Sequence, residues 1–209
     1  MVFSLACLML LVPPSRAAAP ESSAVQAAAT LESAAIPRPG APVLAALSSR
    51  PVVATLRGVV DLQGMALTFD RRAWTIRGVI HAMPLDVSVD QNAGTMTGSE
   101  NGRPVDLNFT WSPDQMTVSG AVNGMPLRYT VVWASGTLDG QADGAALHLD
   151  FDLAAGTASG TADGAAVQLA MDAPSGRMTG SLHGAPVEMV SVNESLSDVL
   201  QCFFLFLKR

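Results

Sequence analysis

Three histidines are the first candidates for chemistry, because imidazole groups that converge are typical ligands of zinc. They are His81, His148 and His183, and each stands in a different copy of a repeated unit. His148 is expected to face Asp139 across two neighbouring strands on the solvent side. The sequence therefore predicts no metal site.

Acidic and hydroxyl side chains follow the pattern of the strands. A general acid and base need different environments to separate their pKa values, and nothing desolvates one acid relative to another. The acids expected on the outer face are Asp106, Asp139, Asp150 and Asp152. Serines and threonines fill polar strand positions, and none has a histidine and an acid arranged around it. We expect no catalytic residue, no cofactor and no enzyme activity.

Six aromatic residues are the one feature that is spread unevenly over the repeats. They lie in the half of each hairpin away from the Asn-Gly turns: Trp74, Phe109, Trp111, Tyr129, Trp133 and Phe151. One interpretation is that the wider end of a tapered core takes bulkier side chains. The other is a mouth that accepts an apolar ligand, or a girdle at a membrane interface.

A regular series of glycines defines the elements that position these residues. Its members are separated by 20, 20, 22, 20, 20 and 20 residues: Gly58, Gly78, Gly98, Gly120, Gly140, Gly160 and Gly180. A fixed period of this kind indicates a repeat architecture. Soon after the glycine come Asn, Asp or His and a second Gly, which between alternating segments predict a hairpin turn. These pairs are Asn101-Gly102, Asn123-Gly124, Asp143-Gly144, Asp163-Gly164 and His183-Gly184. His81-Ala82 occupies the same slot.

A two-residue turn also sets the register of the strands. At Asn123-Gly124 it places Gly120 opposite Leu127 on an apolar face and Thr117 opposite Thr130 on a polar face. The same alternation follows from the turns at 101–102 and 143–144, and a period of two is typical of half-buried strands. The predicted fold is all-β: an antiparallel meander of about seven hairpin repeats of about 20 residues, curled into a barrel or flattened roll. The repeated glycines are interpreted as making room on a concave apolar face.

The chain divides into four segments. A short apolar run before Pro13 predicts a signal peptide over residues 1–19, and an Ala- and Pro-rich stretch predicts a disordered stem over 20–49. The repeats occupy 50–192, and a short apolar helix is expected over 193–209. Its run of phenylalanines is expected to seal the mouth of the roll, or to meet a partner protein or a membrane surface. Without the signal peptide, Cys202 is the single cysteine, so no intramolecular disulfide is expected.

Composition limits the classes of function. With a net charge of −6 and 12 Lys plus Arg, the chain lacks the basic surface that nucleic-acid binding requires. The leading hypothesis is a non-catalytic exported protein, secreted or located in the periplasm or cell envelope. It would act as a structural or binding module holding an apolar small molecule or lipid in its curved interior. Small residues are expected to leave room there: Ala142, Ala145, Ala158, Ala162 and Ala165. The alternative is an outer-membrane β-barrel whose apolar face is turned to lipid.

Overall fold

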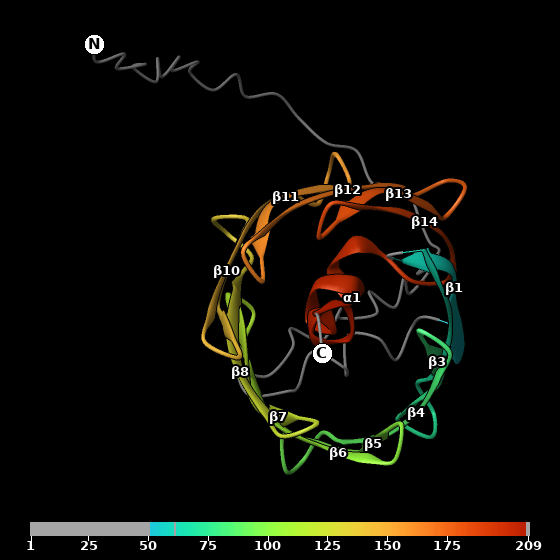
Figure 1. The fold of residues 1–209 in the computed structure, drawn as a ribbon, viewed down its shortest axis with the longest axis vertical. Coiled ribbons are helices and arrows are strands. Elements are labelled where there is room, and N and C mark those ends of the chain that lie inside the picture. Colours follow the sequence, from blue (N-terminus) through green and yellow to red (C-terminus); the bar gives the residue numbers. More distant parts are fainter. Residues whose placement is uncertain (1–50, 61, 208–209) are drawn as a thin grey trace, which may run out of the picture. The chain divides into compact units, whose positions relative to one another are not determined.

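The computed structural model describes residues 51–60 and 62–207, so the predicted signal peptide and stem lie outside the described residues. Within these ranges the chain forms fourteen antiparallel strands, each paired with its neighbours in sequence, and β14 pairs with β1 to close a barrel (Figure 1). The predicted meander of seven hairpins is confirmed, and its closure is complete. The strands are β1 (Val53–Val60), β2 (Gln63–Asp70), β3 (Thr75–Ile80), β4 (Met83–Asp90), β5 (Thr95–Glu100), β6 (Arg103–Trp111), β7 (Gln115–Val122), β8 (Met125–Val132), β9 (Thr137–Ala142), β10 (Ala145–Asp152), β11 (Thr157–Ala162), β12 (Ala165–Asp172), β13 (Arg177–Leu182) and β14 (Ala185–Val192).

The tight turns have the geometry that their residues predict. Asn123 and Gly124 both have positive φ angles, 56° and 83°, as a type I′ turn requires. His81 and Ala82 adopt the same conformation, with φ angles of 52° and 61°. The predicted register is confirmed as well: Gly120 pairs with Leu127, and Thr117 with Thr130.

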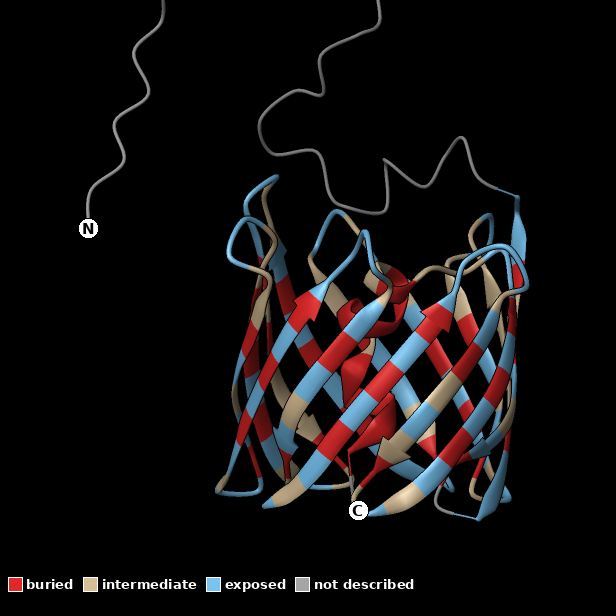
Figure 2. Cartoon of the chain, turned by 90° about the horizontal axis from the view of Figure 1, so that it is seen from above, coloured by how far each residue is buried: buried red, intermediate tan, exposed pale blue. Residues whose placement is uncertain are grey.

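The apolar face of the sheet is the inside of the barrel. Inward side chains from strands all round the wall are fully buried, among them Leu67, Leu107, Val118, Leu138 and Leu149, each 0% exposed. The outward residues that alternate with them are exposed or partly exposed along each strand (Figure 2). The alternation read from the sequence therefore corresponds to the two faces of a closed wall.

The repeated glycines allow the backbones of two neighbouring strands to approach each other closely, which is more than making room for side chains. A Cβ atom on Gly120 would lie 2.2 Å from the backbone oxygen of Asp106 and 2.9 Å from Cα of Leu107, and the φ angle of Gly120 is 145°. A Cβ on Gly98 would lie 2.0 Å from the backbone oxygen of Asp86. Glycine thus kinks the strand against the backbone of the preceding hairpin, which is one way to curve a sheet into a barrel.

The C-terminal segment lies inside the barrel. It comprises residues 193–207 and contains the helix α1 (Leu196–Gln201) and the 3-10 helix η2 (Phe203–Phe206), and its buried residues occupy the interior in both views (Figures 1 and 2). Side chains fill the interior of a barrel of about eight strands, so a wall of fourteen leaves space for this segment. Phe203 and Phe204 are 0% exposed, and the Tyr129 hydroxyl donates a hydrogen bond of 2.8 Å to the backbone oxygen of Gln201. The segment packs within the interior and leaves part of it open, whereas the sequence suggested a seal at the mouth.

No helix within the described residues is long and apolar enough to cross a membrane.

Candidate functional site

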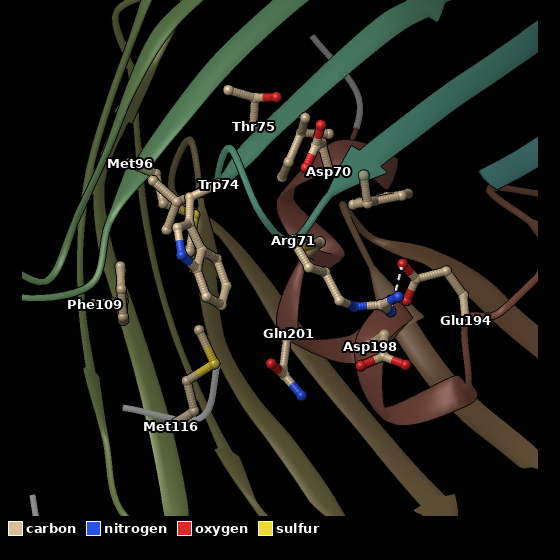
Figure 3. A pocket seen from close by; sticks show the side chains of 14 residues that line it. Asp70, Arg71, Trp74, Thr75, Met96, Phe109, Met116, Glu194, Asp198 and Gln201 are labelled. Carbon is tan, nitrogen blue, oxygen red and sulfur yellow. Dashed lines mark hydrogen bonds and ion pairs between the residues drawn. The ribbon is translucent and has the colours of Figure 1, made fainter. Parts of the chain in front are cut away.

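A cavity lies inside the barrel, between the wall formed by β2 to β7 and the C-terminal segment (Figure 3). The cavity is partly open to solvent. Its apolar lining comes from successive strands: Phe69, Trp74, Ile76, Val89, Met96, Phe109 and Met116. Its polar lining comes mainly from one turn and from the C-terminal segment: Asp70, Arg71, Thr75, Glu194, Asp198, Gln201 and Cys202. Most of the surface that these residues present to the cavity is apolar, which is the usual form of a small-molecule site.

Trp74 stands where four of the other five longer turns have glycine. Its φ angle is 53°, close to the 68° of Gly94 and the 71° of Gly156. Its backbone oxygen accepts a hydrogen bond of 2.8 Å from Val89, as the oxygen of Gly156 accepts one of 2.7 Å from Met171. A side chain in this left-handed conformation costs about 1–3 kcal/mol, and such strain is concentrated at functional sites. Figure 3 shows the Trp74 indole directed into the cavity.

Arg71 connects the turn before β3 to the C-terminal segment. Its guanidinium donates hydrogen bonds of 3.0 Å to the backbone oxygens of Pro51 and Asn193 and to the carboxylate of Glu194. The side chains of Arg71 and Glu194 are only 7% and 4% exposed. A charged pair so well removed from water requires these additional hydrogen bonds. Arg71 therefore holds the first residues of the C-terminal segment against the wall.

Two carboxylates at the cavity shape the backbone around them. Asp70 accepts hydrogen bonds of 2.8 Å from the backbone N–H groups of Arg72 and Ala73. The bonds from Ala73 and Arg72 lower the pKa of the Asp70 carboxyl. Asp198 accepts hydrogen bonds from the backbone N–H of Ser195 at 2.8 Å and from its hydroxyl at 2.6 Å, and Ser195 is the N-cap of α1.

Cys202 faces the cavity with a thiol of low reactivity. Burial raises the pKa of the Cys202 thiol far above its ordinary value, and the thiolate is the nucleophilic form of cysteine. The thiol therefore stays protonated at neutral pH. Burial likewise raises the pKa of Tyr129, which keeps its hydroxyl protonated as the donor to Gln201.

The structure brings two of the six predicted mouth residues together. Trp74 and Phe109 line the cavity, whereas Trp111 is half-buried against the core. Tyr129 is 1% exposed and hydrogen-bonded to α1. The rings of Trp133 and Phe151 form an edge-to-face pair with centroids 6.1 Å apart.

The alanines that were expected to provide room lie elsewhere. Ala142, Ala158 and Ala162 are buried in the core, and none of the five alanines lines the cavity. This cavity lies where the C-terminal segment leaves the wall uncovered, so side-chain size along the wall did not locate it.

Sequence reasoning missed the polar side of the cavity. Arg71, Glu194, Asp198 and Gln201 belong to a turn and to the last segment, so no strand pattern identifies them. One signal was present in the longer turn after Asp70. It contains Arg71, Arg72 and Trp74, whereas the corresponding positions of the next longer turn are Gln91, Asn92 and Gly94. Two arginines and a tryptophan in that position mark this copy as different from the others.

The three histidines are separated, as predicted. His148 lies on the outer face, with Nδ1 2.6 Å from Asp139 and Nε2 3.6 Å from Asp150. His183 lies in the last tight turn and pairs with Asp163 of the preceding hairpin at 3.0 Å. No three His, Cys, Asp or Glu side chains in residues 51–60 and 62–207 are grouped so that they could hold a metal ion.

Comparison with known proteins gave no match: no family model, no curated protein and no solved structure aligns significantly with this chain.

Proposed function

We propose that this protein is a non-catalytic exported binding module that holds a small apolar molecule or lipid inside its barrel. The cavity between β2–β7 and the C-terminal segment carries the proposal, because it lies inside the barrel wall, is mainly apolar and is bordered by a strained tryptophan. Export rests on the apolar run before Pro13. Location in the secreted fraction, the periplasm or the cell envelope follows from export.

The outer face argues against the alternative of a barrel that faces lipid. Arg77 pairs with Asp86 at 3.0 Å in the middle of neighbouring strands, and both side chains are 61% exposed. Arg177 and Glu188 form a similar exposed pair at 2.6 Å. In a membrane barrel the outward face carries an apolar band, and an arginine at its midplane costs about 2–4 kcal/mol. Most of the apolar residues of this wall point to the interior instead, and the exposed ones are valines of β1, β3 and β14.

The phenylalanines of the C-terminal segment are not proposed as a contact for a partner protein or membrane. Phe203 and Phe204 are 0% exposed and Phe206 is 3% exposed. Each phenylalanine buries about 150–250 Å², worth several kcal/mol at roughly 25 cal/mol/Å². Exposing them to a partner would require the segment to leave the barrel and forfeit this stabilisation.

The test is the binding of a neutral apolar dye whose emission reports an apolar site. Phenylalanine in place of Trp111 and Trp133 leaves Trp74 as the only tryptophan, since the chain has three. We expect N-phenyl-1-naphthylamine to gain emission when added to this variant and to quench Trp74 fluorescence in a saturable way. A folded protein, checked by its β-type circular dichroism, that leaves both signals unchanged would contradict the proposal.

A further inference from the structure

The polar groups around the cavity are predominantly acidic. Three carboxylates line it, those of Asp70, Glu194 and Asp198, and Arg71 is the single basic residue among the lining residues. Three negative charges against one positive charge give a formal charge of −2. The side of α1 that faces the cavity adds the amide of Gln201 (Figure 3).

Arg71 is not available to hold an acidic ligand. Recognition of a carboxylate or phosphate by arginine uses its fork of N–H donors. Here the guanidinium already donates to Pro51, Asn193 and Glu194, each at 3.0 Å. A fatty acid in this cavity would displace these bonds and would place its charge beside three carboxylates. The charge of the cavity therefore disfavours an anionic head group.

The aromatic wall favours the opposite charge. The face of an indole attracts a cation through its quadrupole, and tryptophan is the best of the aromatic residues for this purpose. Trp74 presents its indole to the cavity from a left-handed backbone conformation, which glycine adopts in corresponding turns such as those of Gly94 and Gly156. The strained tryptophan and the surplus of carboxylates are independent features, and they meet in one cavity.

We propose that the ligand of this cavity is an apolar cation, an aliphatic or aromatic group that carries an ammonium or quaternary ammonium head. The proposal rests on the binding function proposed above and names its ligand class. The apolar part lies against Ile76, Met96 and Phe109, and the head lies between the Trp74 indole and the carboxylates at the C-terminal segment. Recognition is by charge complementarity and by the indole face.

Three probes with the same chain and different heads test this ligand class: dodecyltrimethylammonium, dodecan-1-ol and dodecanoate. Each competes with N-phenyl-1-naphthylamine for the full chain, below the concentration at which it forms micelles. We expect the cation to bind at least about tenfold more tightly than dodecanoate, with the alcohol between them. Equal affinities, or tighter binding of dodecanoate, would overturn the ligand class and leave the binding function standing. Failure of all three probes and of the dye would contradict the binding function itself.

Two substitutions locate the preference. Asp198→Asn is expected to lower the affinity for the cation and to leave that for the alcohol nearly unchanged, and Trp74→Leu is expected to do the same. Asp139→Asn removes one negative charge from the outer face, where Asp139 is 59% exposed, and is the matched control. If Asp139→Asn lowers the affinity for the cation as much as Asp198→Asn does, the preference for a cation comes from the net charge of the protein and the assigned site is wrong. If the Asp198→Asn variant does not fold, the relative affinities of the three probes and the effect of Trp74→Leu still test whether the cavity prefers a cation.

Discussion

The half of the barrel wall that borders the cavity, β2 to β7, and the other half, β8 to β14 with β1, are built from the same repeat, yet they pack differently. Met96 in β5 and Met178 in β13 occupy the same position, two residues before the repeated glycine. Met96 lies opposite Val89 and Leu107 and borders the cavity. Met178 lies opposite Met171 and Met189, and is 0% exposed. Equal positions in a repeat therefore do not have equal surroundings, because a single C-terminal segment cannot cover all of a fourteen-stranded wall.

The longer turns show the same difference. Asp70, Asp90 and Asp152 each accept hydrogen bonds from two backbone N–H groups in the turn that follows. These turns end in a left-handed residue, which is glycine after Asp90 and Asp152 and is Trp74 after Asp70. The backbone geometry is kept and only the side chain changes. An indole side chain thus takes the place of a glycine without altering the strand pairing.

The largest loss of stability is expected at the repeated glycines, where the two halves of the wall should behave alike. A Cβ atom on Gly98 or on Gly160 would lie 2.0 Å from a backbone oxygen of the neighbouring strand. We expect Gly98→Ala and Gly160→Ala each to lower the free energy of unfolding by about 3 kcal/mol or more, at or above the usual cost of overpacking. Urea denaturation measures both. A stability unchanged by either substitution would show that the repeated glycines are not needed to kink the wall.

The next effect should separate the two halves. Met178→Trp has no space to enter and is expected to cost about 1–3 kcal/mol, whereas Met96→Trp extends into the cavity and should cost less than half of that. The larger side chain at position 96 should also exclude the neutral dye. Thermal melts and dye titrations of the two variants provide the comparison. Equal destabilisation by both would mean that the cavity does not exist in solution.

Exchange of the turn residue should give a smaller effect. Gly156→Ala adds a side chain in a left-handed conformation and should cost about 1–2 kcal/mol, in addition to the contact of its Cβ, 2.3 Å from the oxygen of Met171. Trp74→Gly relieves the corresponding strain while it removes the contacts of the indole, so its cost should be smaller than that of Gly156→Ala. Denaturation curves for the two variants test the difference. A larger loss from Trp74→Gly would indicate that Trp74 serves stability and not binding.

The smallest effect concerns a charged pair on the outer face. His148 and Asp139 lie opposite each other on β10 and β9. Asp86 and Arg77 occupy the corresponding positions on β4 and β3. The hydrogen bond to Asp139 raises the pKa of His148 above its ordinary value of 6.5. Since the folded pKa is the higher one, the stability that His148 contributes is complete below pH 6.5 and is lost as the pH rises through the folded value.

Unfolding curves between pH 5 and 9 should show this loss. The difference in stability between the protein and His148→Gln should shrink as the pH rises. The difference for Arg77→Gln should stay constant, because an arginine remains charged throughout. A His148→Gln difference that is constant or grows with pH would contradict the assigned pair.

Most of the wall was predictable from the sequence because its rules are local. A two-residue turn such as Asn123-Gly124 fixes which residues lie opposite one another, and the alternation along the strands then assigns each residue to a face. His148 and Asp139 were placed together on the outer face in this way. The function of the glycines was only partly predictable, because the carbonyl that approaches Gly120 belongs to the preceding hairpin.

The cavity could be predicted only in part. The aromatic pattern selected Trp74 and Phe109, which line it, together with Tyr129, Trp133 and Phe151, which serve the core. All of them lie toward the same end of the barrel, and the strand pattern does not distinguish one sector of the wall from another. Arg71 and Glu194 are 123 residues apart in the chain, and no local pattern relates a turn to a segment so distant.

The sequence by itself determined the number of hairpins, their register and the face on which each strand residue lies. These properties depend on backbone conformation at the turns and on a period of two, both of which a few neighbouring residues encode. The tertiary structure decided that β14 closes on β1, that the C-terminal segment enters the interior, and that an unfilled space with an acidic border remains beside β2–β7. These depend on the width of the closed wall and on how one short segment packs within it, which are set only when all fourteen strands are in place.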